Sequence, residues 1–204
     1  VPSPSPNGNN IFSCPMHEYD LDHARCAREI LRSFDLCRTL DPHHPCFVHV
    51  CRVRPETGYA LFAETVDILR TNPTVRTALA EHPADEPPED AVAHLSRSAY
   101  LAARPRPFHC ESDLASIENA KKPASGEEFL RRTLTILGHG AKGLFYRGAP
   151  PSDANLAAAV NHAASDLNAS IVQVRDLLSI ADVYEGAATV PGRHDVSIYP
   201  LLAA

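Results

Sequence analysis

The chain has 204 residues, of which 44% are hydrophobic and 22% charged, a composition typical of a globular protein with room for one sizeable core. Its formal net charge is −6 and no run of Lys and Arg is present, which argues against a nucleic-acid partner because phosphate binding requires a basic surface. No apolar run reaches the roughly 18 residues of a membrane-spanning helix, and no basic-then-apolar signal stretch begins the chain. We therefore expect no membrane partner. Because the first residue is not Met, we expect a processed chain or one cut from a longer sequence.

Six cysteines lie in the first 110 residues: Cys14, Cys26, Cys37, Cys46, Cys51 and Cys110. No two of them form a Cys-x-x-Cys pair, and several fall inside apolar runs, where a free cysteine behaves as a small hydrophobe. This pattern predicts reduced, buried thiols and slightly favours the cytoplasm over secretion, without deciding the compartment.

The first elements of the chain alternate between strand and helix. Residues 1–10 are rich in Pro, Ser and Asn and predict a linker or a disordered segment. Residues 11–20 predict a short strand that ends in polar residues, and 21–40 predict a helix with one apolar face. Pro42 and Pro45 end this helix, because proline lacks the amide that a helix interior needs.

The same alternation continues in the middle of the chain. Residues 46–53, "CFVHVCRV", consist of β-formers and predict a strand. A short helix over 57–65 precedes a buried strand over 66–69. A Pro-rich loop over 82–90 leads into a helix over 91–103, whose acidic entry suits the positive end of the helix dipole.

The last third of the chain repeats this order. Residues 106–112 predict a strand, 125–140 a helix, 141–148 another strand and 152–181 a long amphipathic helix. The tail over 195–204 predicts one more strand, without indicating its neighbours. Apolar strands of four to eight residues that alternate with helices are typical of a parallel sheet covered by helices, so we predict an α/β fold with five such units.

The helix over 125–140 carries signals at both ends. Ser125 is a plausible N-cap, since its hydroxyl can accept a hydrogen bond from a free amide of the first turn. Gly138 or Gly140 is expected to end the helix, because glycine tolerates the left-handed conformation that often follows a last turn.

The stretch from "RPFHCESD" onward resembles the last two βα units of a clan A glycoside hydrolase, closest to the β-galactosidase-like families. In those families a Glu ends the seventh strand, as Glu111 does here, and a loop with Asn and Lys-Lys-Pro follows, matched by Asn119, Lys121, Lys122 and Pro123. The helix then runs into "HGAKGLFYRG", which is similar to the family's eighth strand. The resemblance implies a (β/α)₈ TIM-type barrel.

Upstream segments extend the same resemblance. "DPHHPCFVHV" is similar to the fifth strand and its lead-in, "ETVDILRTNP" to the sixth, and "MHEYD" falls where the fourth strand ends. In the family the fourth strand carries the acid/base Glu, normally preceded by Asn; here His17 precedes Glu18.

The resemblance covers strands four to eight alone. It implies that 11–185 form the C-terminal part of a glycosidase-like barrel, with 1–10 as a linker and 186–204 as a tail or the start of a following strand. An open five-strand sheet exposes two edges and half of a barrel interior. We therefore expect a fragment of a longer enzyme, completed by the missing barrel half, with completion by a homo-oligomer partner as the alternative.

The resemblance implies retaining hydrolysis of O-glycosidic bonds in a carbohydrate substrate, without a cofactor. Glu111 would be the nucleophile and Glu18 the acid/base, brought together because strand ends converge at one mouth of a barrel. The alternative for Glu111 is an ordinary loop or helix-entry carboxylate. The alternative for Glu18 is a solvated residue ahead of a helix. Further side chains at strand ends are expected to line the sugar pocket: Tyr146, Arg147, Tyr19, Asp67 and Asn72.

Two other functions stay open. The chain has no Trp, the residue on which sugar rings usually stack, and lacks the family's Asn before Glu18; both favour an inactive glycosidase-like barrel that binds carbohydrate or acts as a scaffold. A metal-dependent hydrolase is the second alternative: His49 and Cys51 share one side of a strand, and His17 and His109 lie at the ends of two others. The histidines scatter widely, however, without a compact His-x-His pair, so our main prediction includes no metal.

Overall fold

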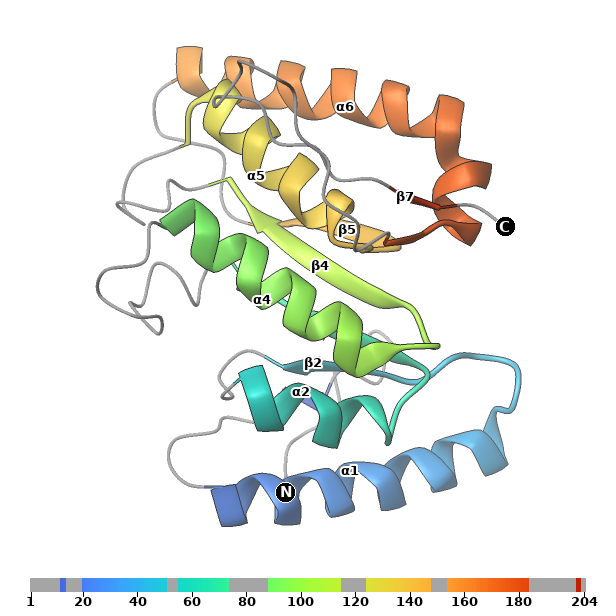
Figure 1. Cartoon of the computed structure of the whole chain (residues 1–204). Coiled ribbons are helices and arrows are strands. Elements are labelled where there is room, and N and C mark those ends of the chain that lie inside the picture. Colours follow the sequence, from blue (N-terminus) through green and yellow to red (C-terminus); the bar gives the residue numbers. More distant parts are fainter. Residues whose placement is uncertain are drawn as a thin grey trace.

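The computed structural model describes residues 12–13, 20–50, 55–73, 88–114, 124–147, 154–183 and 201–202 (Figure 1). Strands and helices alternate along these residues, as the sequence predicts. The helices are α1 (Asp20–Leu40), α2 (Pro55–Ala63), α4 (Pro88–Ala103), α5 (Gly126–Gly138) and α6 (Ala154–Ile180). The strands are β1 (Phe12–Ser13), β2 (Phe47–Val50), β3 (Ile68–Thr71), β4 (Phe108–Asp113), β5 (Gly143–Arg147), β6 (Asp182–Val183) and β7 (Leu201–Leu202).

Five strands form one sheet in the order β1-β2-β3-β4-β5, and every neighbouring pair is parallel. The order in space follows the order in the sequence, so α1, α2, α4 and α5 each lie in the connection between two adjacent strands, whereas α6 leads from β5 to β6 outside this sheet. The predicted α/β class with a parallel sheet is therefore confirmed. Such sequential order is also what a section of a barrel contains.

The hydrophobic core lies between one face of this sheet and the helices. Alternate strand residues such as Val48, Leu69 and Cys110 belong to one buried cluster with Phe34 of α1 and Tyr59 of α2. Figure 1 shows α4 lying across β4 on this side. Since successive side chains of a strand point to opposite faces, the residues between them lie on the face away from this core.

Helix α5 begins and ends as its sequence predicts. The Ser125 hydroxyl accepts a hydrogen bond from the backbone amide of Glu128 at 3.1 Å, which confirms the N-cap. The helix ends at Gly138, and Gly140 follows with a φ of +88°, a conformation in which an L side chain is strained.

Strand β3 and the tail differ from the predicted positions. The third strand begins at Ile68 instead of residue 66, because the register pairs Ile68 with Phe47 at the start of β2. Within the predicted tail strand the structure describes Leu201 and Leu202, which form β7 and pair antiparallel with β6 instead of joining the main sheet. None of the described helices is long and apolar enough to cross a membrane.

The cysteines divide into two groups. Cys37, Cys46 and Cys110 are free thiols, as expected for small hydrophobes in an apolar environment, and Cys110 is completely buried. Cys26 is disulfide-bonded, so the expectation of reduced thiols throughout is wrong at this position. Spacing along the sequence did not indicate this bond, because a disulfide depends on which helices and strands meet in space.

Candidate functional site

A group of polar and charged side chains lies on the face of the sheet away from the helix core. We call it the carboxyl-end cluster, since its members occupy the carboxyl halves of the strands or follow them directly. They come from four neighbouring strands and the residue after β3: His49, Arg70, Asn72, Glu111, Asp113 and Arg147. In parallel α/β sheets this end is where active sites are usually built.

Glu111 is the centre of this cluster and is only 5% exposed. Its Oε1 accepts a hydrogen bond from Arg70 Nη2 at 2.5 Å, and its Oε2 accepts hydrogen bonds from Asn72 Nδ2 at 3.2 Å and Arg147 Nη1 at 3.3 Å. His49 Nε2 lies 3.6 Å from Oε2. A carboxylate buried this deeply requires such partners, because an unpaired buried charge is strongly destabilising.

Asn72 joins Glu111 to a second carboxyl group. Its Nδ2 also lies 3.2 Å from Oδ2 of Asp113, so one amide nitrogen contacts both acids. Burial raises the pKa of Asp113, against the opposing effects of the Asn72 hydrogen bond and of the Arg147 and Arg132 charges. Glu111 and Asp113 therefore have different surroundings, although both lie on the same face of β4. Glu111 pairs with two arginines, whereas Asp113 is contacted by the Asn72 amide.

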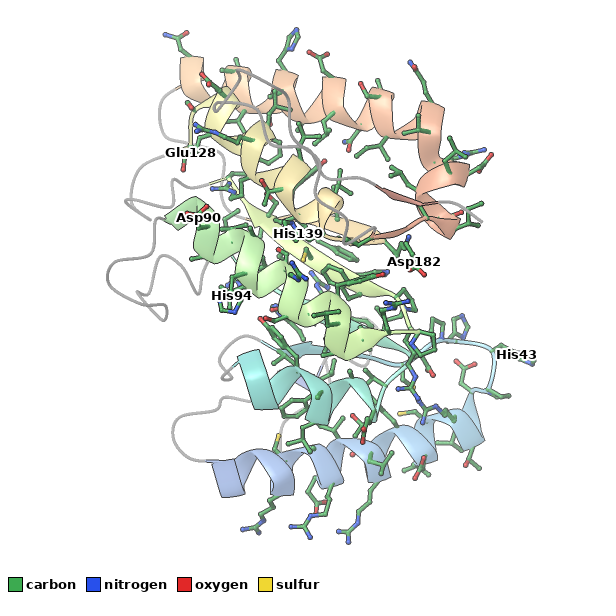
Figure 2. The ribbon with its side chains drawn as sticks, viewed as in Figure 1. His43, Asp90, His94, Glu128, His139 and Asp182 are labelled. Carbon is green, nitrogen blue, oxygen red and sulfur yellow. The ribbon has the colours of Figure 1, made fainter. Side chains whose placement is uncertain are left out.

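Arg132 connects this end of β4 to the helix layer. It is a buried residue of α5 whose Nη2 donates a hydrogen bond to the backbone carbonyl of Asp113. Its Nη1 lies 3.6 Å from Glu128, which is labelled near the start of α5 in Figure 2. Burial lowers the pKa of Arg132, and the charges of Glu128 and Asp113 oppose that effect. The contacts hold the last residue of β4 in place.

Arg70 is held by aromatic rings as well as by Glu111. Its guanidinium carbon lies 3.9 Å from the ring centroid of Phe145 and 5.8 Å from that of Phe47. A guanidinium over a ring face gains cation–π attraction, which is stronger where water is excluded. The side chain is therefore fixed from three directions, and it fixes Glu111 in turn.

Two histidines also lie on this face. Burial lowers the pKa of His49, and it also lowers that of His109, whose ring is 5.7 Å from the ring of Phe145. The Arg70 charge lowers both pKa values further, while the Glu111 carboxylate acts in the opposite direction on His49. Both imidazoles are thus biased toward the neutral form near neutral pH.

The structure brings three of the predicted site residues together: Glu111, Asn72 and Arg147. It places Asp67 before β3, at the other end of the sheet, where its carboxylate accepts hydrogen bonds from Arg38 and from the backbone amide of Cys46. Asp67 thus connects α1 to the residue before β2, and it does not belong to the carboxyl-end cluster.

Tyr146 lies apart from the carboxyl-end cluster, on the helix side of β5. Its ring packs edge-on against Phe129 of α5 at 5.4 Å, and its hydroxyl donates a hydrogen bond to Asn168 of α6 at 2.8 Å. Alternation along β5 explains this placement, because Tyr146 and Arg147 are adjacent and must point to opposite faces.

Four other residues named from the sequence lie outside the described residues. They are Glu18 and Tyr19 of the expected glycosidase site, and His17 and Cys51 of the metal alternative. Within the part of the chain that the structure describes, no three His, Cys, Asp or Glu side chains are grouped as a metal site requires.

Arg70 and Asp113 were not identified from the sequence, although a signal was present. In "DILRTN" a charged residue stands in the middle of an apolar strand, two positions before Asn72, so the period of two places both on one face. The same rule places Asp113 beside Glu111. Applying this alternation to every strand end would have found both residues.

Comparison of the chain with protein-family models, with curated proteins and with solved structures gave no match. The resemblance to glycoside hydrolases therefore depends on the quoted motifs alone.

Proposed function

We propose that this chain is the C-terminal part of a (β/α)₈ glycoside hydrolase of the β-galactosidase-like kind, with Glu111 as its nucleophile. The reaction is hydrolysis of an O-glycosidic bond with retention, and it requires no cofactor. The observation that carries this proposal is the placement of Glu111: a carboxylate in the carboxyl half of a parallel strand, on the sheet face away from the helix core, held by two arginines and an amide.

The sheet topology favours a section of a barrel rather than a doubly wound sheet. A doubly wound sheet reverses its strand order at a switch point and carries helices on both faces. Here the strand order is sequential through five strands, and strand residues of a single face pack with helix residues in the main core. Closure into a barrel requires further strands between β5 and β1, which an upstream segment or a partner would supply.

The contacts of Glu111 suit a nucleophile. A retaining glycosidase needs an ionised, immobile carboxylate that attacks the anomeric carbon from one side of the sugar. Arg70 holds Oε1, and Asn72 and Arg147 hold Oε2, so the carboxylate is charge-balanced and fixed before substrate arrives. Glu18, which the resemblance assigns as acid/base, would protonate the leaving oxygen from a neighbouring strand.

Trapping of the glycosyl-enzyme intermediate tests this proposal directly. The intact protein is incubated with activated fluorosugars, whose glycosyl-enzymes hydrolyse slowly, and the labelled peptide is identified by mass spectrometry. We expect the label on Glu111. We also expect Glu111→Gln to lower kcat by at least about a thousandfold, since an amide is a poor nucleophile.

The matched control is Glu64→Gln, which makes the same chemical change at an exposed position after α2. This variant should keep full activity. A label on any other carboxylate, or equal activity of the two variants, would exclude Glu111 as the nucleophile.

A carbohydrate-binding barrel without activity is the second candidate. The low exposure of Glu111, the engagement of both its oxygens and the lack of Trp in the chain favour it. Under this alternative the intact protein binds sugars, shows no fluorosugar label and binds equally well with Gln at position 111.

A further inference from the structure

Arg147 differs from the other cation of the carboxyl-end cluster in how much of it remains accessible. The Arg70 side chain is 15% exposed and fixed by Glu111 and two rings, whereas the Arg147 side chain is 55% exposed. Among the described residues its one ion pair is the 3.3 Å contact of Nη1 with Glu111. A guanidinium has five N–H donors in a planar fork, so most of its hydrogen-bonding capacity is available to a ligand.

The charges around Arg147 leave it incompletely balanced. Two guanidinium groups share the single carboxylate of Glu111. Asp113 is the register partner of Arg147 across β4 and β5, but its carboxylate accepts a hydrogen bond from Asn72 and forms no ion pair with Arg147 in the described part of the chain. The two histidines on this face are also biased toward neutrality. Among the described residues Arg147 thus has no carboxylate to itself, although more than half of its side chain is accessible to an anionic ligand.

Arg70 already occupies part of the aromatic surface on this face. The guanidinium of Arg70 lies 3.9 Å from the ring centroid of Phe145 and so occupies one face of that ring, while the residue as a whole is 40% exposed. Stacking is therefore restricted to what remains exposed of Phe145, and hydrogen bonds and charge become important for the recognition of a sugar here.

We infer that the sugar bound beside Glu111 carries a carboxylate, as in a hexuronic acid, and that Arg147 binds this group. The inference rests on the proposed function and names its substrate class. An arginine fork fits a carboxylate through two parallel N–H···O bonds, a geometry that a hydroxyl group cannot reproduce. The same side chain, at the end of β5 and in contact with Glu111, would orient the sugar ring relative to the nucleophile.

Equilibrium binding to the intact protein tests this assignment without requiring turnover. The probes are the methyl β-glycosides of galacturonic acid and of galactose, and galactose sulfated at its primary hydroxyl. We expect the uronide to bind at least about tenfold more tightly than the neutral sugar, the size expected for a charge-assisted hydrogen bond, with a preference that weakens as salt is added.

Arg147→Met should abolish this preference, and Arg147→Lys should keep part of it because the charge remains without the fork. The matched control is Arg104→Met: that side chain is 51% exposed and also lies near a carboxylate, Asp182 at 3.6 Å, but at the other end of the sheet. The control should bind like the wild type. Equal binding of the uronide and the neutral sugar, or a preference unchanged in Arg147→Met, would overturn the inference.

Hydrolysis of the para-nitrophenyl glycosides of the same sugars separates the two proposals. Uronide binding through Arg147 without hydrolysis of any glycoside supports the carboxylate site and contradicts the proposed enzyme. Hydrolysis of the galactoside in preference to the uronide supports the enzyme and overturns the carboxylate site. Preference for the sulfated sugar also overturns the assignment to a carboxylate.

Discussion

Two polar clusters lie at opposite ends of the β4–β5 pair, and they differ in what their charges contact. The amino-end cluster consists of Tyr100, Arg104, Lys142 and Asp182, the last of which is labelled in Figure 2. Lys142 Nζ donates hydrogen bonds to the backbone carbonyls of Leu178, at 2.7 Å, and Ala181. Tyr100 donates a hydrogen bond to Asp182 at 3.0 Å.

In the amino-end cluster, Lys142 bonds backbone at the carboxyl end of α6, and the ionic contact between Arg104 and Asp182 is solvent-exposed. In the carboxyl-end cluster, two cations and an amide converge on one deeply buried carboxylate. The first arrangement is sufficient to attach a helix to a sheet. The second buries charge, which contributes little net stability and is often retained for function.

The largest loss of stability should follow the substitution of Arg70, the less exposed of the two arginines that contact Glu111. Arg70→Met leaves the buried Glu111 carboxylate without its shortest ion pair, so we expect a loss of about 3–5 kcal/mol in the free energy of unfolding. Chemical denaturation measures this. Arg104→Met, in the exposed pair of the amino-end cluster, should cost at most about 1 kcal/mol. Equal losses would remove the distinction between the clusters, whereas partial recovery in the double variant Arg70→Met/Glu111→Leu would support it.

An intermediate loss of stability is expected beside the amino-end cluster, where the backbone of Gly140 packs closely against Tyr100. A Cβ at Gly140 would lie 2.6 Å from Cδ2 of Tyr100, and the φ of +88° is itself unfavourable for alanine. Gly140→Ala should therefore cost about 2–3 kcal/mol, measured by denaturation.

The control for this variant is Gly126→Ala. A Cβ at Gly126, at the start of α5, has its nearest neighbour at 3.4 Å and no positive φ. This change should leave stability within about 0.5 kcal/mol of the wild type. A Gly140→Ala variant that is as stable as Gly126→Ala would contradict the tight packing of Tyr100 against this turn.

The smallest effect should be a pH dependence of stability that arises from Asp113 in the carboxyl-end cluster. Burial raises the pKa of Asp113 above its unfolded value, so its contribution to stability is complete below the unfolded pKa and is lost as pH rises through the folded pKa. Asp113→Asn removes this titration. The melting temperature of the variant relative to the wild type should therefore increase from about pH 4 to about pH 8.

Asp176→Asn is the matched control, because Asp176 has a 95% exposed side chain on α6. Its melting temperature should follow that of the wild type at every pH. If Asp113→Asn does the same, the ionised form of Asp113 is not disfavoured in the folded protein.

Much of the fold could be predicted, because local patterns in the sequence reflect local physical constraints. The Ser125 cap, the end of α5 at Gly138 and the alternation of strands with helices were each readable from a few neighbouring residues. The site was predictable in part. Glu111, Asn72 and Arg147 were identified by position at strand ends, but the same rule included Asp67 and Tyr146, which lie elsewhere.

The sequence by itself determined the class of fold, its parallel sheet and the strand ends where polar residues gather, since these follow from periodicity and from helix signals within short windows. Tertiary structure alone decided which of those residues meet. The pairing of Arg70 and Arg147 with Glu111 joins residues 41 and 36 positions apart. Such contacts depend on strand register and on the face to which each side chain points. A shift of the register by one residue would turn the side chains of a strand to the opposite face and separate these partners.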